Sequence, residues 1–118
     1  MNTIIYKILT AAQWEDLQTN EVSVGAPIDV SDGFVHFSNA EQLPETADKH
    51  FQDQTGLVLI AMDAAKLGDK LRWETSRGGD LFPHLYGPLM LDKVLWDKPL
   101  PLENGRHVLP DLENGLCQ

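Results

Sequence analysis

Three short segments of the sequence each place two polar side chains at positions two apart. Residues two apart in a strand point to the same face, so each segment offers one polar face and one apolar face. The pairs are His36 with Ser38, Arg72 with Glu74, and His84 with Tyr86. Together they supply a base, a cation, a carboxylate and a phenol, which is the inventory expected of an active site. If the three strands are neighbours and turn the same face outward, these side chains line one concave patch.

Each candidate also has an ordinary structural explanation, and the sequence leaves both explanations open. One face of an antiparallel sheet is commonly polar and wet without having a function. The Ser38 hydroxyl fits the N-cap of a following helix better than it fits a nucleophile. Arg72 and Glu74 fit a surface ion pair as well as a catalytic or ligand-binding pair. His84 fits equally a packed ring that hydrogen-bonds the backbone and a ligand-binding residue.

The histidine spacing gives little support to a metal site. His36, Glu74 and His84 could converge in the fold, but no histidine pair has the His-x-His or His-x-x-x-His spacing of common zinc sites. The sequence also has no P-loop, no Gly-x-Gly-x-x-Gly and no Gly-x-Ser-x-Gly pattern. We therefore expect no metal ion, and we set aside the enzyme classes that depend on these motifs.

Length and composition indicate one globular domain with an acidic surface. The chain has 118 residues, of which 42% are hydrophobic and 23% charged, as in an ordinary globular protein. Its 18 acidic and 9 basic residues give a formal net charge of -9. Such a surface repels a phosphate backbone, so we expect no long nucleic acid as a partner. A small nucleotide remains compatible, because one arginine or the backbone amides of a turn can hold a phosphate.

The ends of the chain favour a cytoplasmic protein. Cys117 is the only cysteine and cannot form a disulfide within the chain. The first residues have no basic segment followed by a long apolar stretch, and no window approaches about 18 apolar residues. We therefore predict a single cytoplasmic domain over residues 1–118 without membrane attachment, in which residues 110–118 form a flexible tail. The oligomeric state does not follow from the sequence.

Short apolar runs between turn residues predict a domain of mixed α and β structure in which strands outnumber helices. The run at residues 57–62 is the most apolar and does not alternate, which is typical of a central strand buried on both faces. Other strands are expected at residues 3–9, 34–38, 71–74, 84–86, 93–97 and 106–109.

Helices are predicted at fewer places. Thr10 and Gln13 have the spacing of a capping box, so a helix is expected to begin there and to end near Asn20. Residues 25–33 are rich in glycine, proline and aspartate, which predicts a loop. Further helical segments are expected at residues 44–51, after a turn at residues 39–43, and at residues 64–67.

Four segments of the sequence together resemble a known bacterial family. They are Asp32-Gly-Phe-Val-His-Phe-Ser38, Ala40-Glu-Gln-Leu43, Leu71-Arg-Trp-Glu74 and Phe82-Pro-His-Leu-Tyr-Gly-Pro-Leu89. The chain is similar to the family catalogued as domain of unknown function 952 from the first strand to about Trp96. That family resembles the ADP-ribosyltransferase-like group. The resemblance implies an α+β fold with a twisted, mostly antiparallel split sheet, two or three helices and a nicotinamide dinucleotide cleft.

The same resemblance implies roles for several candidate residues. His36, in a His-x-Ser context, matches the histidine that holds a ribose and the nicotinamide amide in that group. Tyr86 corresponds to an aromatic residue that stacks on a ring, and Glu74 is the nearby candidate for a catalytic glutamate. NAD or a related nucleotide is the cofactor or substrate that these matches imply.

The leading hypothesis is a small-ligand protein, and a candidate enzyme, that binds a nucleotide or nicotinamide-like molecule. The expected ligand-binding residues are Ser38, Arg72, His84 and Tyr86, and the expected catalytic residues are His36 and Glu74. The Glu74 carboxylate would stabilise positive charge at a sugar carbon during ADP-ribosyl or glycosyl transfer or hydrolysis. The alternative is a non-catalytic protein-interaction or regulatory module that uses the acidic surface and the apolar segment around Leu100, Leu102 and Leu109.

Overall fold

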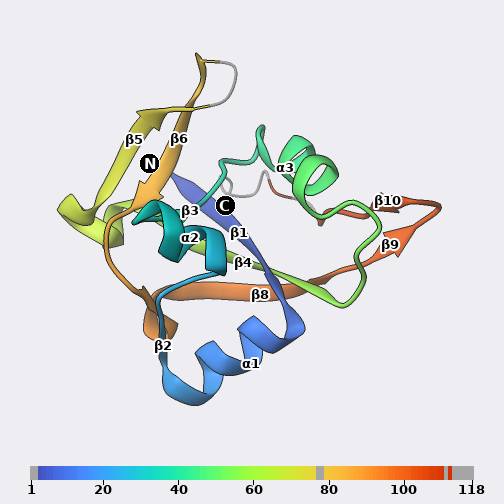
Figure 1. Cartoon of the computed structure of the whole chain (residues 1–118), viewed down its shortest axis with the longest axis horizontal. Coiled ribbons are helices and arrows are strands. Elements are labelled where there is room, and N and C mark those ends of the chain that lie inside the picture. Colours follow the sequence, from blue (N-terminus) through green and yellow to red (C-terminus); the bar gives the residue numbers. More distant parts are fainter. Residues whose placement is uncertain (1–2, 77–78, 111, 113–118) are drawn as a thin grey trace.

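Two three-stranded antiparallel sheets form the body of the protein (Figure 1). The structure, a computed structural model, describes residues 3–76, 79–110 and 112. The first sheet has the strand order β1-β4-β8, with β1 at Ile4–Thr10, β4 at Leu57–Asp63 and β8 at Val94–Leu100. The second has the order β3-β6-β5, with β3 at Val35–His36, β6 at Leu81–Leu85 and β5 at Leu71–Thr75. Every strand pair in this part of the chain is antiparallel, which confirms a mostly antiparallel α+β fold.

Shorter elements connect and cover these sheets. Two further strand pairs are β2 (Val22–Ser23) with β7 (Leu89–Met90) and β9 (Leu102–Glu103) with β10 (Arg106–His107). The helices are α1 (Ala11–Asn20), α2 (Pro27–Asp32) and α3 (Leu43–His50), with 3-10 segments η1 (Ala64–Lys70) and η3 (Leu91–Lys93). Over the described ranges, no helix is long and apolar enough to cross a membrane.

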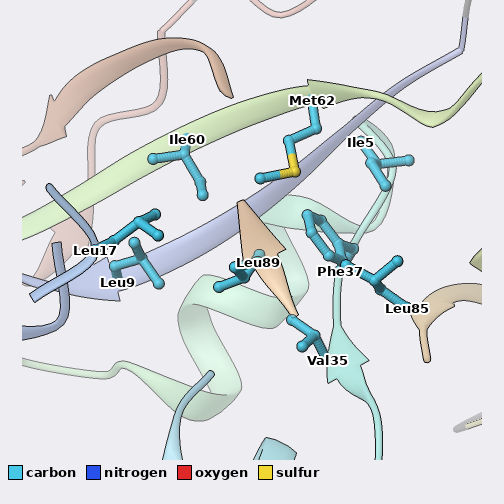
Figure 2. Packing of buried hydrophobic residues seen from close by; sticks show 9 residues of the cluster. All are labelled: Ile5, Leu9, Leu17, Val35, Phe37, Ile60, Met62, Leu85 and Leu89. Carbon is cyan, nitrogen blue, oxygen red and sulfur yellow. The ribbon is translucent and has the colours of Figure 1, made fainter. Parts of the chain in front are cut away.

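Strand β4 is the centre of the first sheet, as its apolar sequence predicts. It pairs with β1 on one side and with β8 on the other, and six of its seven residues are buried. Its alternate residues belong to two hydrophobic cores. Ile60 and Met62 pack with Leu17 of α1 and with residues of the second sheet (Figure 2), whereas Leu59 packs with Leu43 of α3.

A backbone bridge joins the two three-stranded sheets. The Tyr6 N–H of β1 donates to the Ser38 carbonyl at 2.8 Å, and the Ser38 N–H donates to the Tyr6 carbonyl at 2.9 Å. Ser38 lies two residues beyond the end of β3. The bridge therefore brings the middle of β1 against the chain that leaves β3, and it places β1 side chains next to the second sheet.

The predicted capping box at the start of α1 is confirmed. The Gln13 N–H donates to the Thr10 hydroxyl oxygen at 3.1 Å, and the Thr10 N–H donates to the Gln13 Oε1 at 2.9 Å. The helix ends at Asn20, followed by Glu21 in the left-handed conformation. Leu17 is its buried residue, so α1 attaches to the first core through a narrow apolar stripe.

Helix α2 replaces the loop predicted at residues 25–33. Pro27 opens the helix, where its missing N–H costs nothing and its fixed φ suits a helical start. Gly33 ends it in the left-handed conformation with φ 88°, and its N–H donates to the Asp29 carbonyl at 2.9 Å. The loop prediction was wrong because these turn-forming residues are the start and end signals of a six-residue helix.

The predicted N-cap role of Ser38 is also wrong. Its hydroxyl lies 2.9 Å from the Thr46 hydroxyl oxygen, and the residue is only 4% exposed. Asn39 and Gln42 instead exchange side-chain-to-backbone hydrogen bonds at 3.0 and 2.8 Å in the turn before α3. This exchange satisfies the backbone before Leu43, so the serine is left to pack against the helix.

The apolar C-terminal segment contributes to the second core. Leu100 is 1% exposed, and Leu109 and Leu112 pack against the same cluster. The Tyr6 hydroxyl donates to the Leu112 carbonyl at 3.1 Å. Leu100 is therefore unavailable as part of a protein-interaction surface. Of the tail predicted at residues 110–118, residues 111 and 113–118 lie outside the described part of the chain.

Candidate functional site

A cavity of about 470 Å³ opens between β1, α2, β3, α3 and β6. This volume falls in the range of small-molecule pockets, roughly 300–1,000 Å³. The polar lining residues include Lys7, Asp29, Asp32, His36, Ser38 and His84, and the apolar ones include Pro27, Ile28, Phe37, Leu43, Phe51 and Phe82. A mainly apolar wall with a few polar groups is typical of a site that binds a small organic molecule.

Asp29 is a buried carboxylate in the wall of the cavity, with 1% of its surface exposed. Its Oδ1 accepts from the His36 backbone N–H at 3.1 Å and lies 2.7 Å from the His36 Nδ1. Its Oδ2 accepts from the Ala26 N–H at 2.7 Å and from the Lys7 ammonium at 3.0 Å. Each oxygen thus has two partners, which is what a buried carboxylate needs.

These contacts keep the buried Asp29 carboxylate ionised beside Lys7. Burial alone would raise the pKa of Asp29, but the hydrogen bond from His36, the charge and hydrogen bond of Lys7, and the Ala26 N–H together lower it to about 2. Burial lowers the pKa of Lys7, and Asp29 opposes that change. The Lys7 ammonium also donates to the His36 carbonyl at 3.0 Å. Asp29 is therefore ionised at neutral pH and acts only as an acceptor.

The local sequence explains how Asp29 reaches this position. It is the third residue of α2, from which a short side chain can turn back to the N–H of the N-cap residue Ala26. Gly25 precedes the helix with φ 97°, and a Cβ there would lie 2.8 Å from the Asp29 Cβ and clash with its carboxylate. Glycine is therefore needed at position 25 for its conformation and for the close approach of Asp29.

His36 is held between two carboxylates. Its Nδ1 donates to the Asp29 Oδ1, and its Nε2 lies 3.0 Å from the Asp32 Oδ2 at the end of α2. The side chain is 35% exposed, so the ring is anchored on its inner side and open to the cavity on the other. Because an ionised carboxylate has no proton to give, both contacts are hydrogen bonds only when both ring nitrogens carry protons.

His84 lies directly opposite His36 in the second sheet, with a different carboxylate partner. Its Nδ1 is 2.9 Å from the Glu74 Oε1, which also accepts from the Tyr86 hydroxyl at 2.8 Å. These bonds from His84 and Tyr86 lower the pKa of Glu74, and the bond to Glu74 raises the pKa of Tyr86. The Arg72 guanidinium carbon lies 5.3 Å from the centre of the Tyr86 ring, within cation–π range.

Phe34 packs among these rings and sets their spacing. Its ring centre is 4.1 Å from that of His84 in a stacked arrangement, 4.6 Å from that of His36 and 5.3 Å from that of Tyr86. The two histidine ring centres are 5.6 Å apart at a steep angle. The imidazoles therefore form part of one aromatic cluster between the cavity and the outer face of β6.

The six residues predicted from strand alternation divide into two groups. The strands of His36, His84, Arg72 and Glu74 are neighbours in the order β3-β6-β5, as the concave patch required, whereas Ser38 and Tyr86 lie just beyond the ends of β3 and β6. His36, Ser38 and His84 line the cavity, whereas Arg72, Glu74 and Tyr86 form an adjoining cluster outside the lining. His84 belongs to both groups, because its ring faces the cavity and hydrogen-bonds Glu74.

Sequence reasoning missed Asp29, Lys7 and Asp32. A weak signal for Lys7 is its position in the middle of an otherwise apolar strand, where a charge needs a buried partner. Asp29 follows Pro27 by two positions, which fits the first turn of a helix as well as a loop. The contact between them joins residues 22 positions apart, and no local pattern predicts it.

Within the described ranges, no group of three or more histidine, cysteine, aspartate or glutamate side chains has an arrangement that could hold a metal ion. The acceptors nearest the histidines are already hydrogen-bonded to them. The groups best placed to hold an organic ligand are the two imidazoles and the aromatic side chains of the wall.

The fold belongs to a recognised class of small α+β proteins. The chain belongs to the family described as protein of unknown function (DUF952), whose model matches residues 8–97. The match confirms the resemblance carried by the segments around His36, Glu74 and His84. No curated protein matches the chain.

Solved structures of protein CC0527 from Caulobacter crescentus are similar to this chain. Its crystal structure is 45% identical, with a TM-score of 0.87, and the match covers 90% of this chain and 94% of the other. A solution NMR structure of CC0527 is 43% identical with a TM-score of 0.80, and it covers 96% of both chains. The likeness therefore extends over nearly the whole fold described above.

Proposed function

We propose that this protein binds a small nucleotide-type molecule, such as NAD, ADP-ribose or AMP, in the cavity beside His36. The observation that carries the proposal is an open cavity of about 470 Å³ next to a histidine whose ring is fixed by a buried carboxylate. A ring held in one orientation loses little freedom when it hydrogen-bonds a ligand, so it binds more tightly than a mobile one.

The chemistry of the wall supports a ligand with a flat heterocycle and a polar sugar. Phe37, Phe51 and Phe82 offer apolar and aromatic surface to a base, and His84 offers its Nε2 to a hydroxyl group. His36 can offer its Nε2 to a ligand that displaces the Asp32 carboxylate. The sequence resemblance to the ADP-ribosyltransferase-like group, together with two small antiparallel sheets, supports the same ligand class.

The charges of the cavity support chemistry at a sugar carbon. Asp32 is a partly exposed carboxylate of the lining, and it favours positive charge that develops when a glycosidic bond breaks. In the described part of the chain no arginine belongs to this lining, and its lysine, Lys7, is already paired with Asp29, so a phosphoryl group in transfer would lack its usual partner. The reaction class we propose is therefore glycosyl or ADP-ribosyl transfer or hydrolysis.

The proposal is tested by recording amide NMR spectra while NAD, ADP-ribose and AMP are added in turn. We expect saturable shifts at residues 36–38 and at His84, and about tenfold weaker binding by His36→Gln, the equivalent of one lost hydrogen bond. Glu103→Gln, an exposed site on β9, is the matched control and should bind normally. Absence of saturable shifts at millimolar ligand would contradict the proposal.

A second candidate function is a protein-interaction module, supported by exposed apolar side chains on and before α2. Val24 is 69% exposed, Ile28 60% and Val30 58%, in a chain whose large apolar residues are mostly buried. In this case the titration would give no shifts with any nucleotide, and Ile28→Ser would weaken capture of a protein partner without affecting the fold.

A further inference from the structure

The two imidazoles of the cavity are in different protonation environments. At His36 both ring nitrogens face carboxylates, Asp29 at 2.7 Å and Asp32 at 3.0 Å. Carboxylates accept and do not donate, so each ring nitrogen that hydrogen-bonds its carboxylate does so through an N–H. His36 is thereby prepared to give a proton to a ligand that displaces Asp32, whose side chain is 42% exposed.

His84 has only one carboxylate partner. Glu74 accepts the proton on Nδ1 at 2.9 Å, which leaves Nε2 of the neutral ring with a lone pair. No hydrogen bond joins this Nε2 to another residue in the part of the chain that the structure describes, although the His84 side chain is only 6% exposed and lines the cavity. His84 is thereby prepared to take a proton from a molecule in the cavity.

We propose that His36 and His84 act as a general acid and a general base on one ligand, and that Glu74 is the residue that positions His84. This inference rests on the proposed function and narrows its reaction class to hydrolysis. The two ring centres are 5.6 Å apart, so one ligand can contact both. An imidazole whose ring nitrogens both face acceptors can serve as the donor, and one with an open ring nitrogen can serve as the acceptor, which are the two roles that acid–base catalysis requires.

The proposed role of His36 as a general acid indicates which class of bond is cleaved. The nicotinamide of NAD leaves as a neutral molecule and needs no proton, whereas the purine of an ordinary nucleotide leaves as an anion and does. A dedicated acid at His36 therefore favours the N-glycosidic bond of a purine nucleotide such as AMP. The partly exposed carboxylate of Asp32 lies in the same wall, where positive charge on the ribose would be stabilised.

The proposed step is balanced with water as the second reactant. The Nε2 of His84 removes a proton from water while the water oxygen forms a bond to the anomeric carbon of the ribose. The bond from that carbon to the base breaks, and its electron pair takes the Nε2 proton of His36. The products are the free base and ribose 5-phosphate. Solvent then accepts the proton from His84 and returns one to His36.

Glu74 acts through His84 and not on the ligand. It lies outside the cavity lining, and its Oε1 holds the Nδ1 proton that leaves Nε2 of His84 open. The Tyr86 hydroxyl donates to the same oxygen and fixes it further. A carboxylate in this position selects the ring tautomer of the base, as a positioning residue does.

The experiment measures adenine release from AMP by chromatography and AMP binding by calorimetry on the same preparations. We expect release by the native chain, with a rate that falls at both low and high pH because it needs one protonated and one neutral imidazole. His84→Gln should reduce kcat by roughly 100-fold or more with AMP affinity nearly unchanged. Glu74→Gln should reduce kcat less and move only the low-pH limb. Glu103→Gln is the control and should behave like the native chain.

The outcomes separate this inference from the proposed function. Binding of AMP without adenine release at any pH overturns the acid–base pair and leaves the proposed function standing, whereas absence of nucleotide binding overturns both. Unchanged kcat in His84→Gln also overturns the pair. A measurement without ligand decides as well: nitrogen-15 spectra should show the neutral His84 ring with its proton on Nδ1, the nitrogen that faces Glu74, and the opposite tautomer would overturn the assignment.

Discussion

At the scale of single residues, Asp29 determines the geometry of the candidate site. It joins Lys7 of β1, the first turn of α2 and His36 of β3 through one carboxylate. A buried charge is stable only when all of its hydrogen-bond and ion-pair partners are present. Removal of any one partner leaves a buried charged group unpaired and lowers the free energy of unfolding. The orientation of the His36 ring is therefore coupled to the stability of the whole fold.

The lowered pKa of Asp29 predicts how stability changes in acid. The carboxyl has a pKa of about 2 in the folded chain against 3.8 ordinarily, so the folded state favours its ionised form. This contribution, roughly 2–3 kcal/mol, is complete above about pH 4 and is lost as the pH falls toward 2. Urea unfolding at a series of pH values measures it. Asp29→Asn should be less stable at neutral pH and should lack this part of the acid sensitivity, and an unchanged acid profile would contradict the assignment.

At the scale of elements, helix α2 has the largest influence on the cavity. Its first turn carries Asp29 and its last residue, Asp32, reaches the Nε2 of His36. Gly25 and Gly33 flank the helix, and both have positive φ. The two glycines differ in their surroundings, because a Cβ at position 25 would meet the Asp29 carboxylate whereas one at position 33 would meet nothing within 4 Å.

These two glycines give a matched pair of substitutions. Gly33→Ala should cost about 1–2 kcal/mol, the strain of a left-handed alanine. Gly25→Ala should cost roughly 1–3 kcal/mol more, because its methyl group must displace Asp29. Urea denaturation measures both changes. Only Gly25→Ala should also shift the ring signals of His36. An equal decrease in the free energy of unfolding in the two variants would show that the contact with Asp29 does not affect stability.

The sequence predicted the elements that local pattern determines. Alternation gave the segments of His36, Glu74 and His84 one polar face each, and the capping box at Thr10 predicted the start of α1. That these strands are neighbours, in the order β3-β6-β5, was a condition of the predicted patch that only the structure supplies. The sequence could not predict the buried ion pair or α2, because the partners of Asp29 come from three segments and a six-residue helix has too little periodicity to detect. The prediction that Ser38 is an N-cap was wrong because the neighbouring Asn39 forms the turn before α3 through its hydrogen bond with Gln42.

At the scale of the whole molecule, negative charge opposes compaction. The formal net charge of -9 is held within a radius of gyration of 13.4 Å. At about 0.01 M salt the screening length, about 30 Å, exceeds that radius, whereas at 0.15 M it is about 8 Å. Carboxylates on opposite sides therefore repel one another in dilute buffer and hardly at all near physiological salt.

Stability should consequently rise with salt. We expect the thermal midpoint to increase as sodium chloride is raised from about 0.01 to about 0.15 M. The triple variant Glu15→Gln, Glu41→Gln and Glu103→Gln, at exposed positions, should be less sensitive to salt than the native chain. A midpoint that falls with salt would instead mean that attractive surface pairs such as Glu45–Lys49 outweigh the general repulsion.

The partners of Asp29 also bear on when the cavity exists during folding. Lys7, Ala26 and His36 come from separate parts of the chain, and they meet only after β1, α2 and β3 have docked. A chain in which any one of these elements is not docked lacks part of the cavity wall and does not hold the ligand-binding side chains in place. The cavity therefore has its complete wall only in the folded chain, and a ligand that binds there stabilises the folded state over the unfolded one.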